Sequence, residues 1–214
     1  LLSYYQENVT LSFVLNGENA FQVIQTIINK CKNALNLQND ENCVLFTVNG
    51  MQSSSLVSYL FTDPSTASTF PSTVTLDNST CVIIKPHAVK ARTTGAIINH
   101  IITQGYEISA IKSLLFDKIQ AEEFLEVYKG VIPEYTDHTI QLSSGLSIAL
   151  EIRAQNAVET FRQTAGPWDV DMAKELRPDT IRALYGMNRI LNAIHCTDLP
   201  EDAELECEYC FKLL

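Results

Sequence analysis

The sequence predicts an α+β fold of the ferredoxin-like type, an antiparallel four-stranded sheet with helices packed on one side. One observation behind this is composition: 46% of the 214 residues are hydrophobic and 19% are charged, which is typical of a globular chain with a sizeable core. A second is the order of β-rich and helix-like segments after residue 79, which follows a split βαβ pattern. A third is the Ser-, Thr- and Pro-rich stretch at residues 63–73, which separates this part from a shorter one before it.

The elements of the larger part are predicted in order from hydrophobic periodicity. Residues 80–85 form a β-rich run, and residues 94–104 carry apolar side chains at helical spacing until Gly105 ends the pattern. The later elements are a strand at 106–116, a helix at 120–129, a shorter helix at 133–142, a buried strand at 146–152, a helix at 156–164, a short helix from Pro178 and a final strand at 205–213 with Cys207, Tyr209 and Phe211 on one face.

The shorter part repeats a piece of the larger one. Residues 10–21 run in step with residues 147–158, and Gly50-Met51 lines up with Gly186-Met187. The alternative is that any strand-to-helix unit resembles another at this level. We therefore predict that residues 1–62 are the C-terminal half of a degenerate module, that 63–78 are a linker and that 79–214 are a full module. Because the first residue is Leu1, the chain is expected to begin inside a longer protein.

Charge and cysteine content exclude several classes of protein. A net charge of -10 argues against broad binding to nucleic acid or to anionic membranes, and no run approaches the ~18 apolar residues of a membrane span. The six cysteines lack the spacing of a disulfide framework, which indicates a soluble, cytoplasmic protein in a reducing compartment. The pair Cys207-x-x-Cys210 has no second pair to complete a zinc site, so we predict a structural role for it and no protein-bound metal.

A set of chemically related side chains recurs along the larger part. His195 lies among short polar residues at 192–198, after an apolar segment expected to be helical, and a neutral imidazole is a good nucleophile at pH 7. Taken singly, each candidate is more often structural, but together three cations, an imidazole, an amide and a carboxylate suit a polyphosphate. The candidates are Lys85, Arg162, Arg182, Asn192, His195 and Glu206. Glu206, on a strand beside the histidine, would hold the ring in one tautomer, and Asn192 would bind a ribose hydroxyl.

Residues 80–213 resemble the nucleoside diphosphate kinase family. The motifs that carry the resemblance are Lys85-Pro86, Ser144-Gly145, the helix from Asn156 to Arg162, Pro178-x-Thr180-Ile181-Arg182 and the heptapeptide at 192–198. The resemblance implies that His195 accepts the phosphate, with Glu206 and Lys85 completing the catalytic set. It also implies that Lys85, Arg162, Arg182, Asn192 and Thr197 bind the nucleotide, that Thr197 replaces a serine, and that Mg²⁺ arrives with the nucleotide.

The chain departs from the family pattern at several positions. Leu125 stands where a tyrosine is usual, Trp168 where a threonine is common, and His87-Ala88 where Asp-Gly is common. Residues 122–130, 165–167 and 195–202 are most similar to the second kinase module of the branch formed by the seventh family member. That branch has two kinase-like modules behind a DM10 domain and lies inside the doublet microtubules of cilia and flagella.

Two functions follow from this resemblance. The preferred one is a structural microtubule inner protein of the axoneme, with tubulin and other doublet microtubule inner proteins as partners and with its two modules paired within one chain. The alternative is an active kinase that transfers the terminal phosphate of ATP to nucleoside diphosphates through a phosphohistidine.

Overall fold

The computed structural model describes residues 12–15, 17–34, 53–54, 56–57 and 72–214. The chain divides into two units, residues 1–71 and 72–214, at a point inside the predicted linker. No helix among the described residues is long and apolar enough to cross a membrane.

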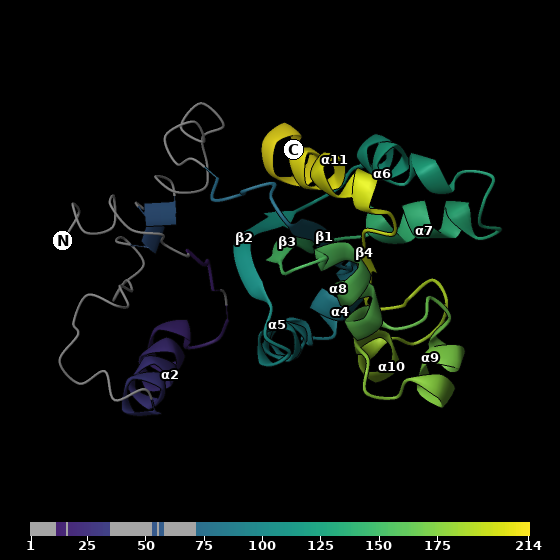
Figure 1. Ribbon diagram of the computed structural model, residues 1–214. Helices are drawn as coiled ribbons and strands as arrows, with labels where there is room; N and C mark the ends of the chain where they lie inside the picture. Colours follow the sequence, from purple (N-terminus) through teal and green to yellow (C-terminus); the bar gives the residue numbers. More distant parts are fainter. Residues whose placement is uncertain (1–11, 16, 35–52, 55, 58–71) are drawn as a thin grey trace. The chain divides into compact units, whose positions relative to one another are not determined.

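The second unit is built around an antiparallel sheet of four strands, which confirms the predicted fold class (Figure 1). The strands are β1 (Ser79–Ile84), β2 (Glu107–Leu114), β3 (Ser147–Arg153) and β4 (Ile194–Cys196). They lie in the order β2-β3-β1-β4, so β1 is central and pairs Val82 with Leu150 on one side and Ile83 with His195 on the other. The short strand β4 is thus an edge strand of the sheet, and it carries His195.

Helices cover both faces of this sheet, and the prediction of a single covered face is wrong. Cys81 and Ile83 of β1 pack with α6 (Lys118–Phe124), α7 (Tyr135–Leu142) and α11 (Ala203–Glu208). Val82 and Ile84 point the other way, into a cluster with α5 (Thr94–Thr103), α8 (Ala157–Ala165) and α10 (Ile181–Tyr185). Figure 1 shows α6 and α11 on one side of the sheet and α5 and α10 on the other. Because successive side chains in a strand alternate between faces, the unbroken apolar run of β1 requires cover on both.

The C-terminal segment 205–213 is helical, so its prediction as a strand is also wrong. It forms α11 and then a π-helix, η4 (Tyr209–Leu213). Cys207, Cys210 and Phe211 are buried, while Leu205 is 65% exposed. Burial at i, i+3 and i+4 is the spacing of one helix face, and this competing period was present in the sequence.

The remaining elements follow the predictions with small shifts. The predicted helix at 120–129 is α6 followed by the 3₁₀ turn η2 (Glu126–Tyr128). The N-cap of α6 is Asp117, whose side chain forms a capping box with Gln120. The helix predicted from Pro178 is α10, which ends at Tyr185, so the segment directly before the heptapeptide is not helical. The other elements are α4 (Pro86–Lys90), α9 (Val170–Leu176), which was not predicted, and the 3₁₀ turn η3 (Pro200–Asp202).

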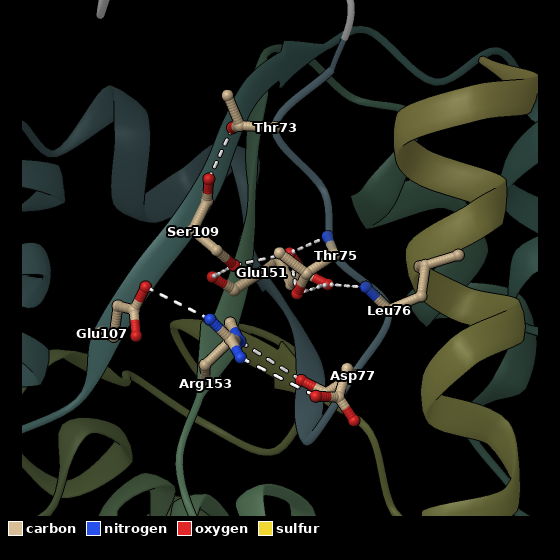
Figure 2. Close-up of polar contacts among 8 residues, drawn as sticks. All are labelled: Thr73, Thr75, Leu76, Asp77, Glu107, Ser109, Glu151 and Arg153. Atoms are coloured by element: carbon tan, nitrogen blue, oxygen red, sulfur yellow. Dashed lines mark hydrogen bonds and ion pairs between the residues drawn. The ribbon is translucent and has the colours of Figure 1, made fainter. Parts of the chain in front are cut away.

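A buried carboxylate fastens the segment before β1 to the sheet (Figure 2). Glu151, on the central strand β3, is fully buried and accepts hydrogen bonds from the backbone N–H groups of Thr75 at 2.8 Å and Leu76 at 2.7 Å. The Ser109 hydroxyl donates a third. Burial raises the pKa of Glu151, but these hydrogen bonds outweigh it and leave the pKa below its ordinary value. The strand β1 therefore begins from an anchored position.

Among the described residues of the first unit, the longest element is the 15-residue helix α2 (Ala20–Ala34). It is preceded by Asn19 in the left-handed region at φ 54°, and α8 is preceded by Asn156 at φ 51°. Both helices thus begin at equivalent points of the two sequence repeats, after the same unusual turn. The duplication itself stays a prediction. In the first copy Gln25 takes the place of Arg162, while the counterparts of Arg182 and His195, Phe46 and Tyr59, lie outside the described residues.

Candidate functional site

Six of the predicted site residues converge at one end of the sheet. Lys85 follows the end of β1 and His195 lies on its neighbour β4. Arg162 comes from α8 and Arg182 from α10, Asn192 comes from the loop before β4, and Glu206 comes from α11 rather than from the strand that was predicted for it. The strand pairing of β1 with β4 is what brings the lysine and the histidine together.

His195 is held by one ring nitrogen and free at the other. Its Nε2 lies 2.9 Å from Glu206 Oε2, and because a carboxylate only accepts, Nε2 carries the proton. The same carboxylate oxygen accepts from Thr197 Oγ1 at 2.8 Å, and Thr197 in turn accepts from the Cys81 N–H at 3.1 Å. His195 Nδ1 is buried without a hydrogen-bond partner. Its lone pair is therefore available to an electrophile.

Lys85 is buried near His195, and its ammonium group is hydrogen-bonded to the side-chain amide of Asn192. Its Nζ donates to Asn192 Oδ1 at 2.7 Å and to the Ile190 carbonyl at 3.4 Å. Burial, together with the nearby Arg182 guanidinium, lowers the pKa of Lys85 to about 7. Asn192 Nδ2 lies 3.4 Å from the Trp168 carbonyl, so both ends of the Asn192 side chain are engaged and its predicted ribose contact stays a prediction.

The two arginines have different surroundings. Arg182 is 4% exposed and its Nη1 donates to the Gly166 carbonyl at 2.8 Å, while its Nε is buried without a partner. The Arg162 side chain is 49% exposed; its Nη1 donates to the Asp198 carbonyl at 2.7 Å and its Nε pairs with the Asp198 carboxylate at 3.5 Å. Arg182 thus offers positive charge inside the site, and Arg162 offers it at the rim.

Trp168 divides the site into an inner and an outer part. The inner cavity, about 10 Å³, has Lys85, His138 and His195 among its lining residues. The outer groove, about 440 Å³, is lined by three arginines, Arg162, Arg177 and Arg182, and also by the carboxylates of Glu159 and Asp198. Trp168 lines both, and only the groove has the size of a small-molecule site.

Two residues near His195, Tyr128 and His138, were not found from the sequence. Tyr128 packs its ring edge-on against His195 with centroids 6.2 Å apart, and its hydroxyl donates to Asp198 Oδ2 at 2.6 Å. Leu125, at the position where the family has a tyrosine, is 5% exposed and lines the inner cavity. His138 is 2% exposed, with Nδ1 at 3.5 Å from Lys85 Nζ. Its position on the apolar face of α7 gave no signal, because a lone histidine there is usually structural.

The site favours anions over metal ions. Among the described residues, no group of three or more His, Cys, Asp or Glu side chains is arranged to hold a metal ion. Cationic side chains dominate instead, and such donors match the oxygens of phosphate groups.

Comparison with known proteins places this arrangement in a family. Residues 78–213 match the nucleoside diphosphate kinase family. The chain is 48% identical over 142 residues to nucleoside diphosphate kinase homolog 7 of Rattus norvegicus, a match that covers 66% of this chain and 36% of that protein. It is 33% identical over 132 residues to nucleoside diphosphate kinase of Aquifex aeolicus, covering 62% of this chain and 92% of that protein.

The structural comparison agrees. The crystal structure of the Aquifex aeolicus nucleoside diphosphate kinase matches with a TM-score of 0.61 and 32% identity, over 63% of this chain and 95% of that one. The matched part of this chain spans about a third of the rat homolog 7. Since the family match covers most of the chain, the protein belongs to the nucleoside diphosphate kinase family, in a divergent branch related to homolog 7.

Proposed function

We propose that residues 79–214 transfer the terminal phosphate of a nucleoside triphosphate to a nucleoside diphosphate through a phosphohistidine at His195. The observation that carries this proposal is the state of the imidazole: Nε2 is bonded to Glu206, and the buried Nδ1 has no partner. An imidazole fixed in this tautomer is a nucleophile that needs no separate base.

The transfer follows from the surroundings of Nδ1. Its lone pair forms a bond to the γ-phosphorus while the bond from phosphorus to the bridging oxygen breaks, and the diphosphate leaves with that electron pair. The positive charge that develops on the ring is stabilised by Glu206 through Nε2–H. Lys85 and Arg182 stabilise the charge on the phosphate oxygens. An acceptor diphosphate then attacks the phosphohistidine and restores the free ring.

Magnesium fits this site as an ion carried by the nucleotide. The cationic residues would bind phosphate oxygens directly, and Mg²⁺ on the nucleotide would neutralise further phosphate charge. The protein residues would orient the phosphates and exclude water, while the ion would be held by the nucleotide.

The proposal is tested by phosphorylation with γ-labelled ATP. We expect acid-labile label on the parent chain, its loss in His195→Ala, and its release by added diphosphate as labelled triphosphate. His100→Ala, which removes a histidine from the distant helix α5, is the matched control and should keep the label. Equal labelling of the parent and His195→Ala would reject the proposal.

We also propose that the protein serves as a structural, tubulin-binding component of ciliary doublet microtubules, alongside other doublet microtubule inner proteins. Supporting this are the 48% identity to homolog 7, the residues at Leu125 and Trp168 that depart from the family pattern, and the small inner cavity. A binding surface and a pocket can occupy different faces of one fold, so the two proposals are compatible. Pairing of two modules within a longer chain stays a prediction.

This second proposal is tested by extracting axonemes at moderate salt. We expect the protein to remain with the doublets after soluble and membrane fractions are removed. Complete release into the soluble fraction would contradict it.

A further inference from the structure

The indole of Trp168 contacts both buried cations of the site. Its ring centroid is 5.4 Å from Lys85 Nζ and 5.3 Å from Arg182 Cζ, both within the range of a cation–π interaction. The ring also packs against His138 at 5.0 Å and Tyr128 at 5.8 Å between centroids. The indole is therefore in contact with the two side chains that would bind the phosphates.

Polar atoms around this indole are buried without partners. They are His138 Nε2, Arg182 Nε and His195 Nδ1, on side chains that are 2%, 4% and 1% exposed. A buried donor or acceptor without a partner carries a free-energy cost, and such atoms are rare in folded proteins. Three of them around one cluster indicate a site that is completed by a polar ligand.

The indole itself makes cation–π contacts and contacts with neighbouring rings. Among the described residues, none accepts a hydrogen bond from its ring nitrogen, and the side chain is only half-buried. Its backbone is fixed separately, because the Trp168 carbonyl lies 3.4 Å from Asn192 Nδ2. The side chain can thus leave by rotation about its own bonds while the loop stays in place.

We propose that Trp168 is the gate of the phosphoryl-transfer site. While the indole keeps its contacts with Lys85 and Arg182, the inner cavity of about 10 Å³ holds no more than a water molecule. An anion then reaches only the outer groove. A polyphosphate that displaces the indole exchanges two cation–π contacts for charged hydrogen bonds to Lys85 and Arg182, and it then faces His195 Nδ1. The proposal rests on the proposed phosphotransfer and adds the residue that controls access to it.

A gate at Trp168 predicts that the aromatic side chain weakens the binding of a polyphosphate. When only a fraction of molecules is open, the apparent dissociation constant rises by the inverse of that fraction. We expect Trp168→Ala to bind inorganic tripolyphosphate about tenfold more tightly than the parent, as for an open fraction of about one tenth. Trp168→Phe, which keeps a smaller ring, should fall between them.

Trp168 is the only tryptophan of the sequence, so its fluorescence reports the gate directly. We expect saturating tripolyphosphate to shift the emission of the parent chain to longer wavelength and to increase its quenching by acrylamide. Calorimetry measures the affinities, and Leu176→Ala, an exposed change on the neighbouring helix α9, is the matched control with parent-like affinity.

Two results would overturn the gate. One is unchanged emission at tripolyphosphate concentrations that calorimetry shows to be saturating. The other is a Trp168→Ala chain that binds no more tightly than the parent, or not at all. Labelling of His195 separates the two proposals. If the emission shift and the affinities are as expected but His195 takes up no label, the gate stands and phosphotransfer is rejected. If the parent and Trp168→Ala take up equal label and the emission is unchanged, phosphotransfer stands and the gate is rejected.

Discussion

At the scale of single residues, the site depends on how His195 is oriented. Its ring is packed edge-on against Phe124, with centroids 5.0 Å apart, and bonded to Glu206 at 2.9 Å. Packing limits where the ring can lie, and the carboxylate decides which nitrogen keeps the proton. Glu206 thus acts through the histidine, as a positioning residue.

Removing this carboxylate should slow phosphorylation without weakening phosphate binding. We expect Glu206→Ala to lower the rate of His195 labelling by about 10- to 100-fold, since loss of such a partner frees the ring and its tautomer. Rapid-quench labelling measures the rate, and calorimetry with tripolyphosphate measures the affinity. Glu208→Ala, a change on the same helix whose partner is Lys212, is the control. A Glu206→Ala chain with the rate of the parent would contradict the role.

Lys85 should make phosphate binding depend on pH near neutrality. Burial holds its pKa at about 7, so the free side chain loses its proton as the pH rises through 7. A bound anion favours the charged form and raises the pKa, so affinity is greatest below pH 7 and falls above it. We expect tripolyphosphate affinity to fall by up to about tenfold per pH unit above 7.

The control for this prediction is Lys85→Arg, because a guanidinium stays charged throughout this range. Its affinity should change less between pH 6 and 9 than that of the parent. Parallel profiles for the two chains would show that another group causes the dependence.

At the scale of elements, the hydrogen bonds of Glu151 join β3 to the segment before β1. Glu151→Ala leaves two backbone N–H groups and the Ser109 hydroxyl without their acceptor, and we expect it to lower the free energy of unfolding by about 2 to 4 kcal/mol. Urea denaturation at pH 7 measures this. Glu107→Ala removes a 64% exposed carboxylate from the adjacent strand and should cost about 0.5 kcal/mol or less.

The pH dependence of this contribution has a definite sign. Because the folded pKa of Glu151 lies below its ordinary value of 4.5, its stabilising effect is present above pH 4.5 and is lost as the pH falls through the folded pKa. The difference in stability between the parent and Glu151→Gln should therefore shrink as the solution is acidified. A difference independent of pH would contradict the assignment.

The turn after α8 has room only for glycine. Gly166 has φ +85°, and an added Cβ would overlap the Thr180 side chain, 2.6 Å from its Cβ. We expect Gly166→Ala to cost about 2 to 3 kcal/mol of unfolding free energy and to displace the carbonyl that binds Arg182. Gly105→Ala, with φ +89° and open space, should cost only the backbone strain of about 1 kcal/mol. Equal costs would show that the overlap is relieved.

At the scale of the whole molecule, the site lies within the unit formed by residues 72–214. Both core clusters of the sheet lie in this unit, as do all the site residues from Lys85 to Glu206. We expect a chain of residues 72–214 to fold alone, with a melting temperature within about 3 °C of that of the corresponding transition in the full chain. Calorimetry measures both, and tripolyphosphate affinity should match. A fragment that fails to fold would show that residues 1–71 complete it.

The accuracy of prediction differed between parts of this unit for physical reasons. Strand β1 was placed correctly because it is a short, unbroken apolar run, and helix α5 because its apolar residues recur at helical spacing. The segment 205–213 was misassigned because alternating Cys207, Tyr209 and Phe211 fit a strand, while the helical spacing of Cys207, Cys210 and Phe211 also fits a buried helix face. The final strand is β4, whose three residues are too few to show a period and which forms through its pairing with β1.

The sequence by itself determined the family, the strands β1, β2 and β3 and the set of charged residues that suit a polyphosphate. These are recorded in local patterns and motifs that need no neighbours to be recognised. Only the tertiary structure decided that Glu206 reaches His195 from a helix, that both sheet faces are covered and that the Trp168 indole contacts both Lys85 and Arg182. The direction of a side chain depends on packing between elements distant in sequence, and no local pattern carries that information.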